Sequence, residues 1–138
     1  MTLQEEQLRL SSLSISELNN EIARWLGWTE ISFTRFGWKG KSPKTHKQES
    51  IPSYAFDNAL AFDLFNVVRD RLQVYLMVAS SPEALTYFCQ MDHEVPKWSV
   101  WGEGGTFPYA MCYTTLIADY KLKEIQIEGE KGNDVSAG

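Results

Sequence analysis

Apolar side chains recur at helical spacing in three segments of this chain. In the first segment, Ser14 and Glu17 form a capping-box pattern, and Leu18 and Ile22 share one face. Gly27 stands where a glycine commonly ends a helix. The pattern predicts an amphipathic helix over residues 15–26.

A second helix is predicted after Pro52, with Ser53 as its N-cap. Its apolar stripe faces the core while the carboxylates between the stripe positions face water. The stripe comprises Phe56, Leu60, Leu64, Val67 and Val68. A third helix begins at Phe107, with Thr106 as its cap and Pro108 in the first turn, where the missing N–H costs little.

Four stretches rich in β-branched and aromatic residues predict strands at residues 30–38, 71–79, 84–91 and 97–101. A Ser-Ser-Pro-Glu turn joins the second and third strands into a hairpin. Residues 39–50 show no periodicity and are expected to form a mobile surface loop. Residues 122–130 fit either an edge strand or an extension of the third helix.

The length of 138 residues predicts a single domain over residues 1–138. Its core is expected within residues 14–122, and residues 123–138 are expected to form an edge strand and then a disordered tail. Five Trp, six Tyr and seven Phe exceed what a minimal core requires, so some rings are expected at a surface. These rings and an uncovered sheet edge favour a homo-oligomer.

Charge and cysteine content narrow the class of protein. A net charge of −5 gives no general affinity for nucleic acid. Cys89 and Cys112 fall on a predicted strand and a predicted helix, and two buried free thiols are expected there, as in a reducing cytoplasm. The polar N-terminus is unlike a signal peptide, and no apolar run reaches the ~18 residues of a membrane span.

Four segments follow one another within residues 16–120: ELNNEIARWLGW, PSYAFDNALAF, RLQVYLMVASSPEALTYFCQM and PYAMCYTTLIA. In this order they resemble the phage ABA sandwich domain family. The resemblance implies an α+β fold in which an antiparallel sheet of about four strands lies between helical layers (an α-β-α sandwich), and a phage or prophage origin. It implies no catalytic residues and no cofactor. The family usually has a basic residue where this chain has Tyr113, so any function of that residue is missing here.

The strongest functional candidate is the basic segment from Ile31 to Gln48. It holds five Lys and Arg residues and no Asp or Glu, so it carries +5 and leaves −10 for the remainder of the chain. Cations interleaved with aromatic rings suit phosphates and nucleobases. The expected ligand-binding residues are Arg35, Phe36, Trp38, Lys39, Lys41, Lys44, His46 and Lys47, together with Trp101 from the strand at 97–101. The same pattern also fits a solvated loop whose lysines keep a strand edge soluble.

Other groupings give no sign of catalytic or metal chemistry. The GKS sequence at 40–42 resembles the end of a P-loop, but Arg35 stands where that loop requires glycine. The two cysteines and two histidines lack the close spacing of structural zinc sites. Cys89 and His93 belong to a strand and the turn after it, where packing is the ordinary role. Neither a metal site nor an enzyme is therefore expected.

These observations predict a non-enzymatic phage or prophage protein that acts by binding in the host cytoplasm. The expected purpose is counter-defence, either by sequestering a host immune nucleotide signal or by blocking a host immune protein. A stoichiometric binder needs rigid surface and aromatic anchors rather than catalytic groups, while the purpose itself rests on the phage resemblance. The alternative is a nucleic-acid-binding phage accessory protein that uses residues 35–47.

Overall fold

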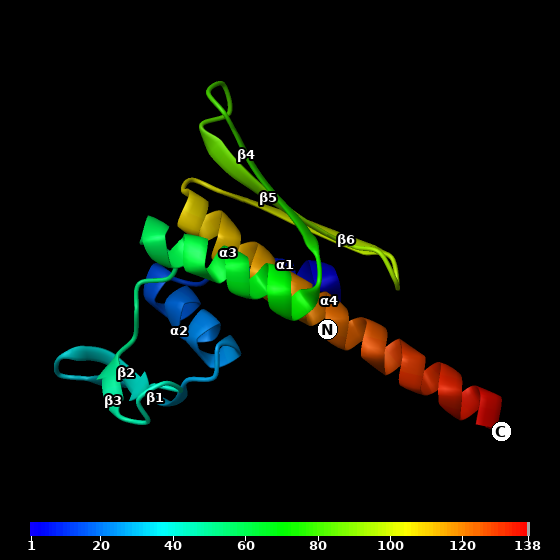
Figure 1. Cartoon of the computed structure of the whole chain (residues 1–138), viewed down its shortest axis with the longest axis horizontal. Coiled ribbons are helices and arrows are strands. Elements are labelled where there is room, and N and C mark those ends of the chain that lie inside the picture. The colour runs from blue at the N-terminus through cyan, green and yellow to red at the C-terminus, as the bar shows by residue number, and fades with distance from the viewer. Residues whose placement is uncertain (138) are drawn as a thin grey trace.

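Over the residues that the structure describes, the chain folds into four α-helices and two three-stranded antiparallel sheets (Figure 1). This computed structural model describes the backbone of residues 1–137 and the side chains of residues 1–129. The fold class is α+β, as the sequence predicts. In chain order the elements are α1 (Leu3–Ser11), α2 (Ile15–Trp25), β1 (Thr29–Thr34), β2 (Gly37–Lys41), β3 (Gln48–Ser50), α3 (Asn58–Leu72), β4 (Tyr75–Ser81), β5 (Thr86–His93), β6 (Trp98–Gly104) and α4 (Phe107–Ala137).

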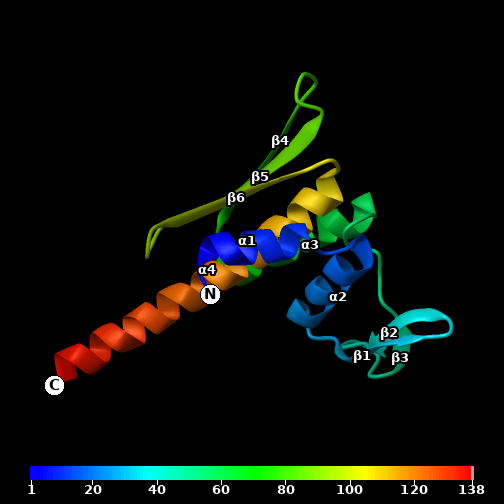
Figure 2. The ribbon, with the colours of Figure 1, turned by 180° about the vertical axis from the view of Figure 1, so that it is seen from behind.

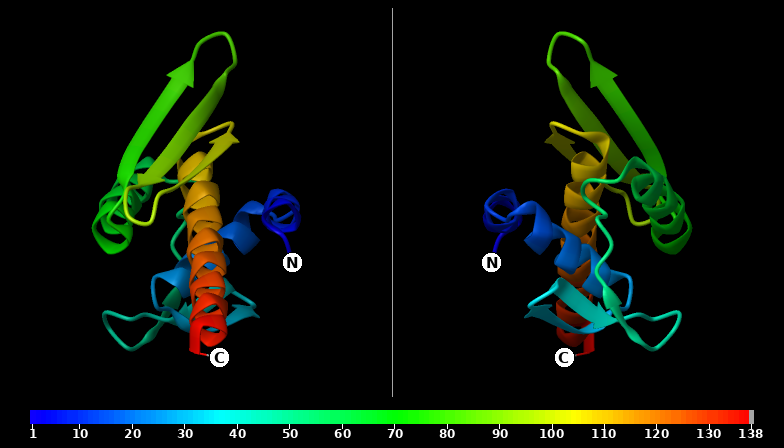
Figure 3. Two further views of the ribbon diagram at one scale, coloured as in Figure 1. Left: turned by 90° about the vertical axis from the view of Figure 1, so that its right-hand side faces the viewer. Right: turned by 90° about the vertical axis from the view of Figure 1, so that its left-hand side faces the viewer.

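The two sheets lie toward opposite ends of the molecule (Figure 3). Sheet A consists of β1, β2 and β3, and sheet B consists of β4, β5 and β6. Each strand pairs with the next one along the chain, so both sheets are simple meanders. In sheet B the first hairpin keeps one continuous register from Tyr75 opposite Asp92 to Ser81 opposite Thr86.

Helix α4 is the central element, because it contacts α1, α2, α3 and the strands β5 and β6 (Figure 2). Thr106 caps it as predicted, since its hydroxyl accepts a hydrogen bond from the Tyr109 N–H at 3.2 Å. Glycine in β6 lets this helix approach the sheet closely. A Cβ at Gly102 would stand 2.5 Å from the Thr114 hydroxyl oxygen, and one at Gly104 would collide with the Tyr109 ring.

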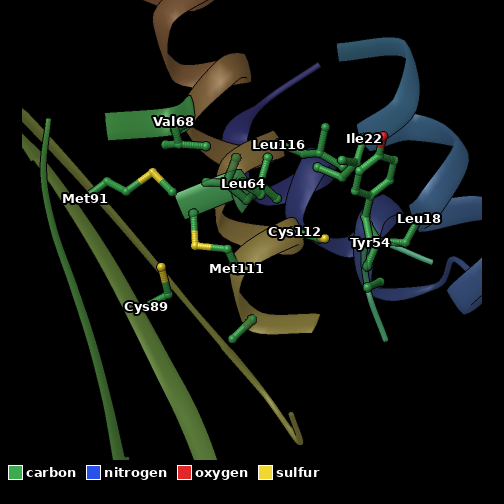
Figure 4. Packing of buried hydrophobic residues seen from close by; sticks show 14 of the residues in the cluster. Leu18, Ile22, Tyr54, Leu64, Val68, Cys89, Met91, Met111, Cys112 and Leu116 are labelled. Carbon is green, nitrogen blue, oxygen red and sulfur yellow. The ribbon is translucent and has the colours of Figure 1, made fainter. Parts of the chain in front are cut away.

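The core lies where sheet B, α3, α2 and α4 meet (Figure 4). Burial of these apolar side chains is the main favourable term in folding, at about 25 cal/mol for each Å² removed from water. Each element contributes one buried face, and the labelled members of the cluster include Cys89 and Met91 from β5, Met111 and Cys112 from α4, Leu64 and Val68 from α3, and Leu18 and Ile22 from α2.

The expected single sheet between two helical layers is wrong. Helices cover only one face of sheet B, and the strand β6 alternates accordingly: Trp98 and Val100 are buried, whereas Ser99, Trp101 and Glu103 are exposed. An antiparallel sheet with polar residues on alternate positions can leave that face in water. Sheet A forms a separate unit instead of adding strands to sheet B.

Sheet A also corrects the prediction of one strand at 30–38 followed by a loop at 39–50. The chain turns back at Arg35 and Phe36, and Gly37 takes φ = 101°, a conformation that glycine adopts without strain. The Thr34 hydroxyl donates a hydrogen bond to the Gly37 carbonyl at 2.8 Å and closes the turn. Gly37 therefore follows a hairpin turn, and β2 and β3 occupy most of the expected loop.

Helix α3 begins later than predicted. Asp57 rather than Ser53 is its N-cap, and the Asp57 carboxylate accepts a hydrogen bond from the Leu60 N–H at 3.0 Å. The Ser53 carbonyl instead closes a separate turn that precedes the helix. Phe56 therefore lies outside the helical stripe and is 76% exposed, while Leu64 is buried as predicted.

At the other end of the chain, α4 continues through residues 121–137. The edge strand expected after residue 122 is wrong, because the helical extension is the alternative that forms. The tail expected to be disordered is helical as far as Ala137, and Gly138 lies outside the described residues. Among the helices described, none has the length and apolar character needed to cross a membrane.

Two sequence predictions about local structure are confirmed. Ser14 and Glu17 form the capping box, with the Ser14 hydroxyl accepting from the Glu17 N–H and the Glu17 carboxylate accepting from the Ser14 N–H, both at 3.1 Å. This exchange also lowers the pKa of Glu17. Cys89 and Cys112 are both free and both buried.

Candidate functional site

The candidate site is a projecting unit that we call the basic arm, residues 29–50, which comprises sheet A and its turns (Figures 1 and 3). At its tip Phe36 is 74% exposed. The guanidinium carbon of Arg35 stands 5.3 Å from the centre of this ring, and the Lys39 Nζ stands 5.7 Å from it. Two predicted cations thus flank one predicted ring, and cation–π attraction holds them around it.

A second aromatic pair lies beside this cluster. Phe33 and Trp38 are opposite one another in the β1–β2 register, and their ring centres are 5.3 Å apart in an edge-to-face arrangement. Phe33 is 70% exposed although it belongs to a strand. The sequence pattern did not single out Phe33, because a ring on a strand is ordinarily read as core; its position opposite Trp38 becomes visible only with the register.

The remaining cations of the arm are dispersed. Lys41 and His46 line a shallow cavity of about 280 Å³ together with Glu30 and Gln48. Lys47 is exposed. The structure therefore brings together the cations at the tip, but it does not gather all of the predicted site residues around one ligand.

Lys44 lies at a different cavity, of about 550 Å³, between α3 and the chain that links β2 to β3. Its walls include the rings of Trp28 and Tyr54, and burial raises the pKa of Tyr54. Its charged lining residues are balanced in sign: Lys44, Arg71, Glu49 and Asp63. A balanced lining gives an anionic ligand no net attraction.

Trp101 does not belong to the basic arm. It lies on β6 in sheet B, where its ring stacks on Phe88 with centres 5.6 Å apart. Figure 3 places sheet B and the arm toward opposite ends of the molecule. The grouping of Trp101 with the basic segment is therefore wrong, because the two parts of the chain belong to separate sheets.

Both thiols are poorly suited to nucleophilic chemistry. Burial raises the pKa of Cys89 from an ordinary value of 9.0 to about 11, and it raises the pKa of Cys112 as well. The thiolate is the reactive form, so both groups are almost fully protonated at neutral pH. Among the described residues, no cluster of His, Cys, Asp or Glu has a geometry that could hold a metal ion.

We expect both cysteines to resist alkylation in the folded protein. At about pH 8 the buried thiols are protonated and inaccessible, so iodoacetamide should react only on unfolding. Mass spectrometry should find no label on the native chain and two labels in strong denaturant, because the chain holds two Cys. Rapid labelling of native Cys89 would contradict its burial.

Comparison with known proteins places the chain by its fold. No protein-family model matches the sequence, and no curated protein does. The α+β arrangement is similar to that of a solved phage protein from Bacillus cereus, with a TM-score of 0.57 over 78% of this chain and 90% of that one. The sequences are 17% identical, so the likeness shows the fold alone. Membership of the phage ABA sandwich family stays a prediction.

Proposed function

We propose that this is a non-enzymatic phage protein that binds and blocks an acidic host protein through the basic arm, as a counter-defence factor. The observation that carries the proposal is the exposed cluster at the tip, where Arg35 and Lys39 flank Phe36. Aromatic and arginine side chains dominate binding energy at protein interfaces. A hairpin presents them at low entropic cost, since its backbone is already ordered.

The geometry favours blocking a protein over sequestering a nucleotide. A small anion is held best in a concave site that surrounds it with donors. The tip is instead a projecting surface, and the cavity next to Lys44 offers balanced charge rather than a cationic lining. A projecting ring flanked by cations suits insertion into an acidic surface of a partner.

The phage assignment rests on the likeness in fold to the Bacillus cereus phage protein and on the sequence resemblance. The proposed counter-defence role follows because a small phage protein without catalytic activity can act in the host cytoplasm by stoichiometric inhibition.

Photo-crosslinking from the tip tests this function. A photoreactive amino acid in place of Phe36 is expected to capture one host protein in cells, because this ring is at the proposed interface. The matched control is the same replacement at Phe56, which is 76% exposed against 74% for Phe36 but lies outside the arm. Capture of the same proteins from both positions, or of none from position 36, would contradict the proposal.

Nucleic-acid binding is the second candidate, because cations and rings alternate along the arm as they do in proteins that stack bases. It predicts crosslinks from position 36 to RNA or DNA rather than to protein. It also predicts an affinity that falls steeply as salt rises, since each phosphate contact releases counterions. Absence of binding to single-stranded DNA and RNA at low salt would exclude it.

A further inference from the structure

The face of sheet B that points away from the helices is uncovered over the part of the chain that the structure describes (Figure 3). On β4 its outward residues are Tyr75, Met77 and Ala79, of which Tyr75 is 66% and Met77 52% exposed. The inward residues of the same strand, Leu76 and Val78, pack against the core. An antiparallel strand with one face in water ordinarily alternates apolar and polar residues. Strand β4 instead has the pattern of a strand that is covered on both faces.

The strand register gathers the outward apolar side chains into one patch. Met77 lies opposite Gln90, and Gln90 lies opposite Trp101, so one row of side chains crosses all three strands. In the next row Ala79 lies opposite Phe88. The Phe88 ring stacks on Trp101, which is 57% exposed. A contiguous group of exposed rings and a thioether is typical of an interaction surface.

Charged residues lie at both ends of the outward face of β6. Glu103 is exposed near the end of this strand, and Lys97 is exposed immediately before its start. Hydrogen bonds from Ser99 and Gln90 lower the pKa of Asp92 on the same face, and the nearby Lys97 charge lowers it further. Six positions of extended chain span about 20 Å, so Lys97 and Glu103 cannot pair within one chain.

We propose that two copies of this chain pack face to face through sheet B, with Lys97 of each copy paired to Glu103 of the other. Aligned sheets pack about 10 Å apart, and the side chains between them interdigitate. The two-fold axis lies between the sheets and runs across the strands near Val100. It places each β6 over the β6 of the other copy in the opposite direction. The start of one strand therefore meets the end of the other, and two ion pairs flank the apolar patch.

Charge selects this arrangement of the two copies. A two-fold axis parallel to the strands would set Asp92 of the central strand against Asp92 of the other copy, and directly opposed like charges are destabilising. The axis across the strands instead sets Asp92 against the Gln90 amide of the other copy, and Tyr75 against Met77. The face thus complements itself in charge and in apolar surface, as an interface between identical copies requires. A nucleic acid is disfavoured here, because Asp92 and Glu103 repel phosphates.

This dimer goes beyond the function proposed for the basic arm and does not depend on it. The arm lies toward the opposite end of the molecule from sheet B (Figure 3). Each copy in the dimer therefore keeps its own arm free, and a chain that cannot dimerise still carries an intact arm.

Sedimentation velocity over a range of protein concentrations tests the dimer. The wild-type chain is expected to approach the dimer mass as its concentration rises. Lys97→Glu and Glu103→Lys should each weaken dimerisation by at least about tenfold, because each variant replaces two ion pairs with two like-charge contacts. The double variant Lys97→Glu/Glu103→Lys restores opposite charges across the interface and keeps the net charge of −5, so it should recover the dimer.

Matched controls come from the arm. Lys39→Glu and Glu49→Lys make the same charge reversals there and should leave dimerisation unchanged. Trp101→Ala should weaken it by more than about tenfold, because tryptophan at the centre of an interface carries much of the binding energy. Phe36→Ala removes an exposed ring from the arm and should have no effect. Circular dichroism confirms that each variant stays folded.

Four results would overturn the proposal. A chain that stays monomeric at every concentration would exclude the dimer, and a dimer that Trp101→Ala leaves unchanged would exclude sheet B as its interface. A dimer that both single charge variants lose, and that the double variant does not recover, would contradict the pairing of Lys97 with Glu103. An equal loss in Lys39→Glu would show a general effect of net charge instead.

Discussion

Replacing Leu64 with alanine is expected to lower the free energy of unfolding by about 2–5 kcal/mol. Leu64 is 2% exposed and belongs to the face of α3 that packs on α4 in the core. The substitution removes buried apolar surface and leaves a cavity that the surrounding helices close only in part. Urea denaturation followed by circular dichroism measures the loss as a shift in the midpoint.

The matched control is Leu8→Ala, the same substitution at a helical position that is 73% exposed. We expect a change within about 0.5 kcal/mol there, because little surface leaves water when this side chain folds. If both variants lost the same stability, Leu64 could not be a core residue of the kind that the structure describes.

Replacing Gly102 with alanine is expected to cost about 1–3 kcal/mol by overpacking. The added Cβ would stand 2.5 Å from the Thr114 hydroxyl oxygen and 2.6 Å from a Tyr113 ring carbon. Thr114 is fully buried, and its hydroxyl donates to the Ala110 carbonyl at 2.7 Å, so it cannot easily move aside. The strand and the helix would have to separate.

Gly105→Ala is the control for this prediction. A Cβ at Gly105 meets no atom within 4 Å. We expect the stability to change by no more than about 0.5 kcal/mol. Thermal unfolding of both variants and of the wild-type protein measures the two changes in stability. If Gly102→Ala were as stable as Gly105→Ala, α4 could not pack on β6 as closely as the structure describes.

The sequence predicts the start of a helix correctly where a single polar side chain is the evident N-cap. The capping box at Ser14 and Glu17 and the cap at Thr106 are examples. The start of α3 was misplaced because two residues competed for the cap: Ser53 and Asp57 both suit that role, and only the extra turn between them selects Asp57.

The arrangement of strands could not be predicted from the same signals. A strand pattern between residues 30 and 38 does not reveal that the chain reverses at Arg35, because the turn residues are themselves ordinary in strands. Pairing partners are set by contacts distant in sequence. Sheet A is therefore a separate sheet, and sheet B has one face exposed to water instead of lying between two helical layers.

The candidate site was predicted in composition but not in geometry. The charge pattern identified Arg35, Phe36 and Lys39, which the structure places together at the tip. Trp101 is an exposed ring, yet it lies on sheet B, where it stacks on Phe88 and not beside the lysines of the arm. A sequence shows which residues along the chain are charged. Which charged residues surround a given side chain is known only from the fold.

The basic arm and sheet B lie toward opposite ends of the molecule (Figure 3).

Phage plating tests most directly whether the arm carries the function. The protein is expressed in hosts that each carry one immune system, and the plating efficiency of a phage that the system restricts is measured. Wild-type protein is expected to restore plating on at least one host. Lys39→Glu should abolish this effect, while Lys97→Glu, the same charge reversal in the exposed β5–β6 turn, should retain it. Full activity of Lys39→Glu, or loss in both variants alike, would contradict a function carried by the basic arm.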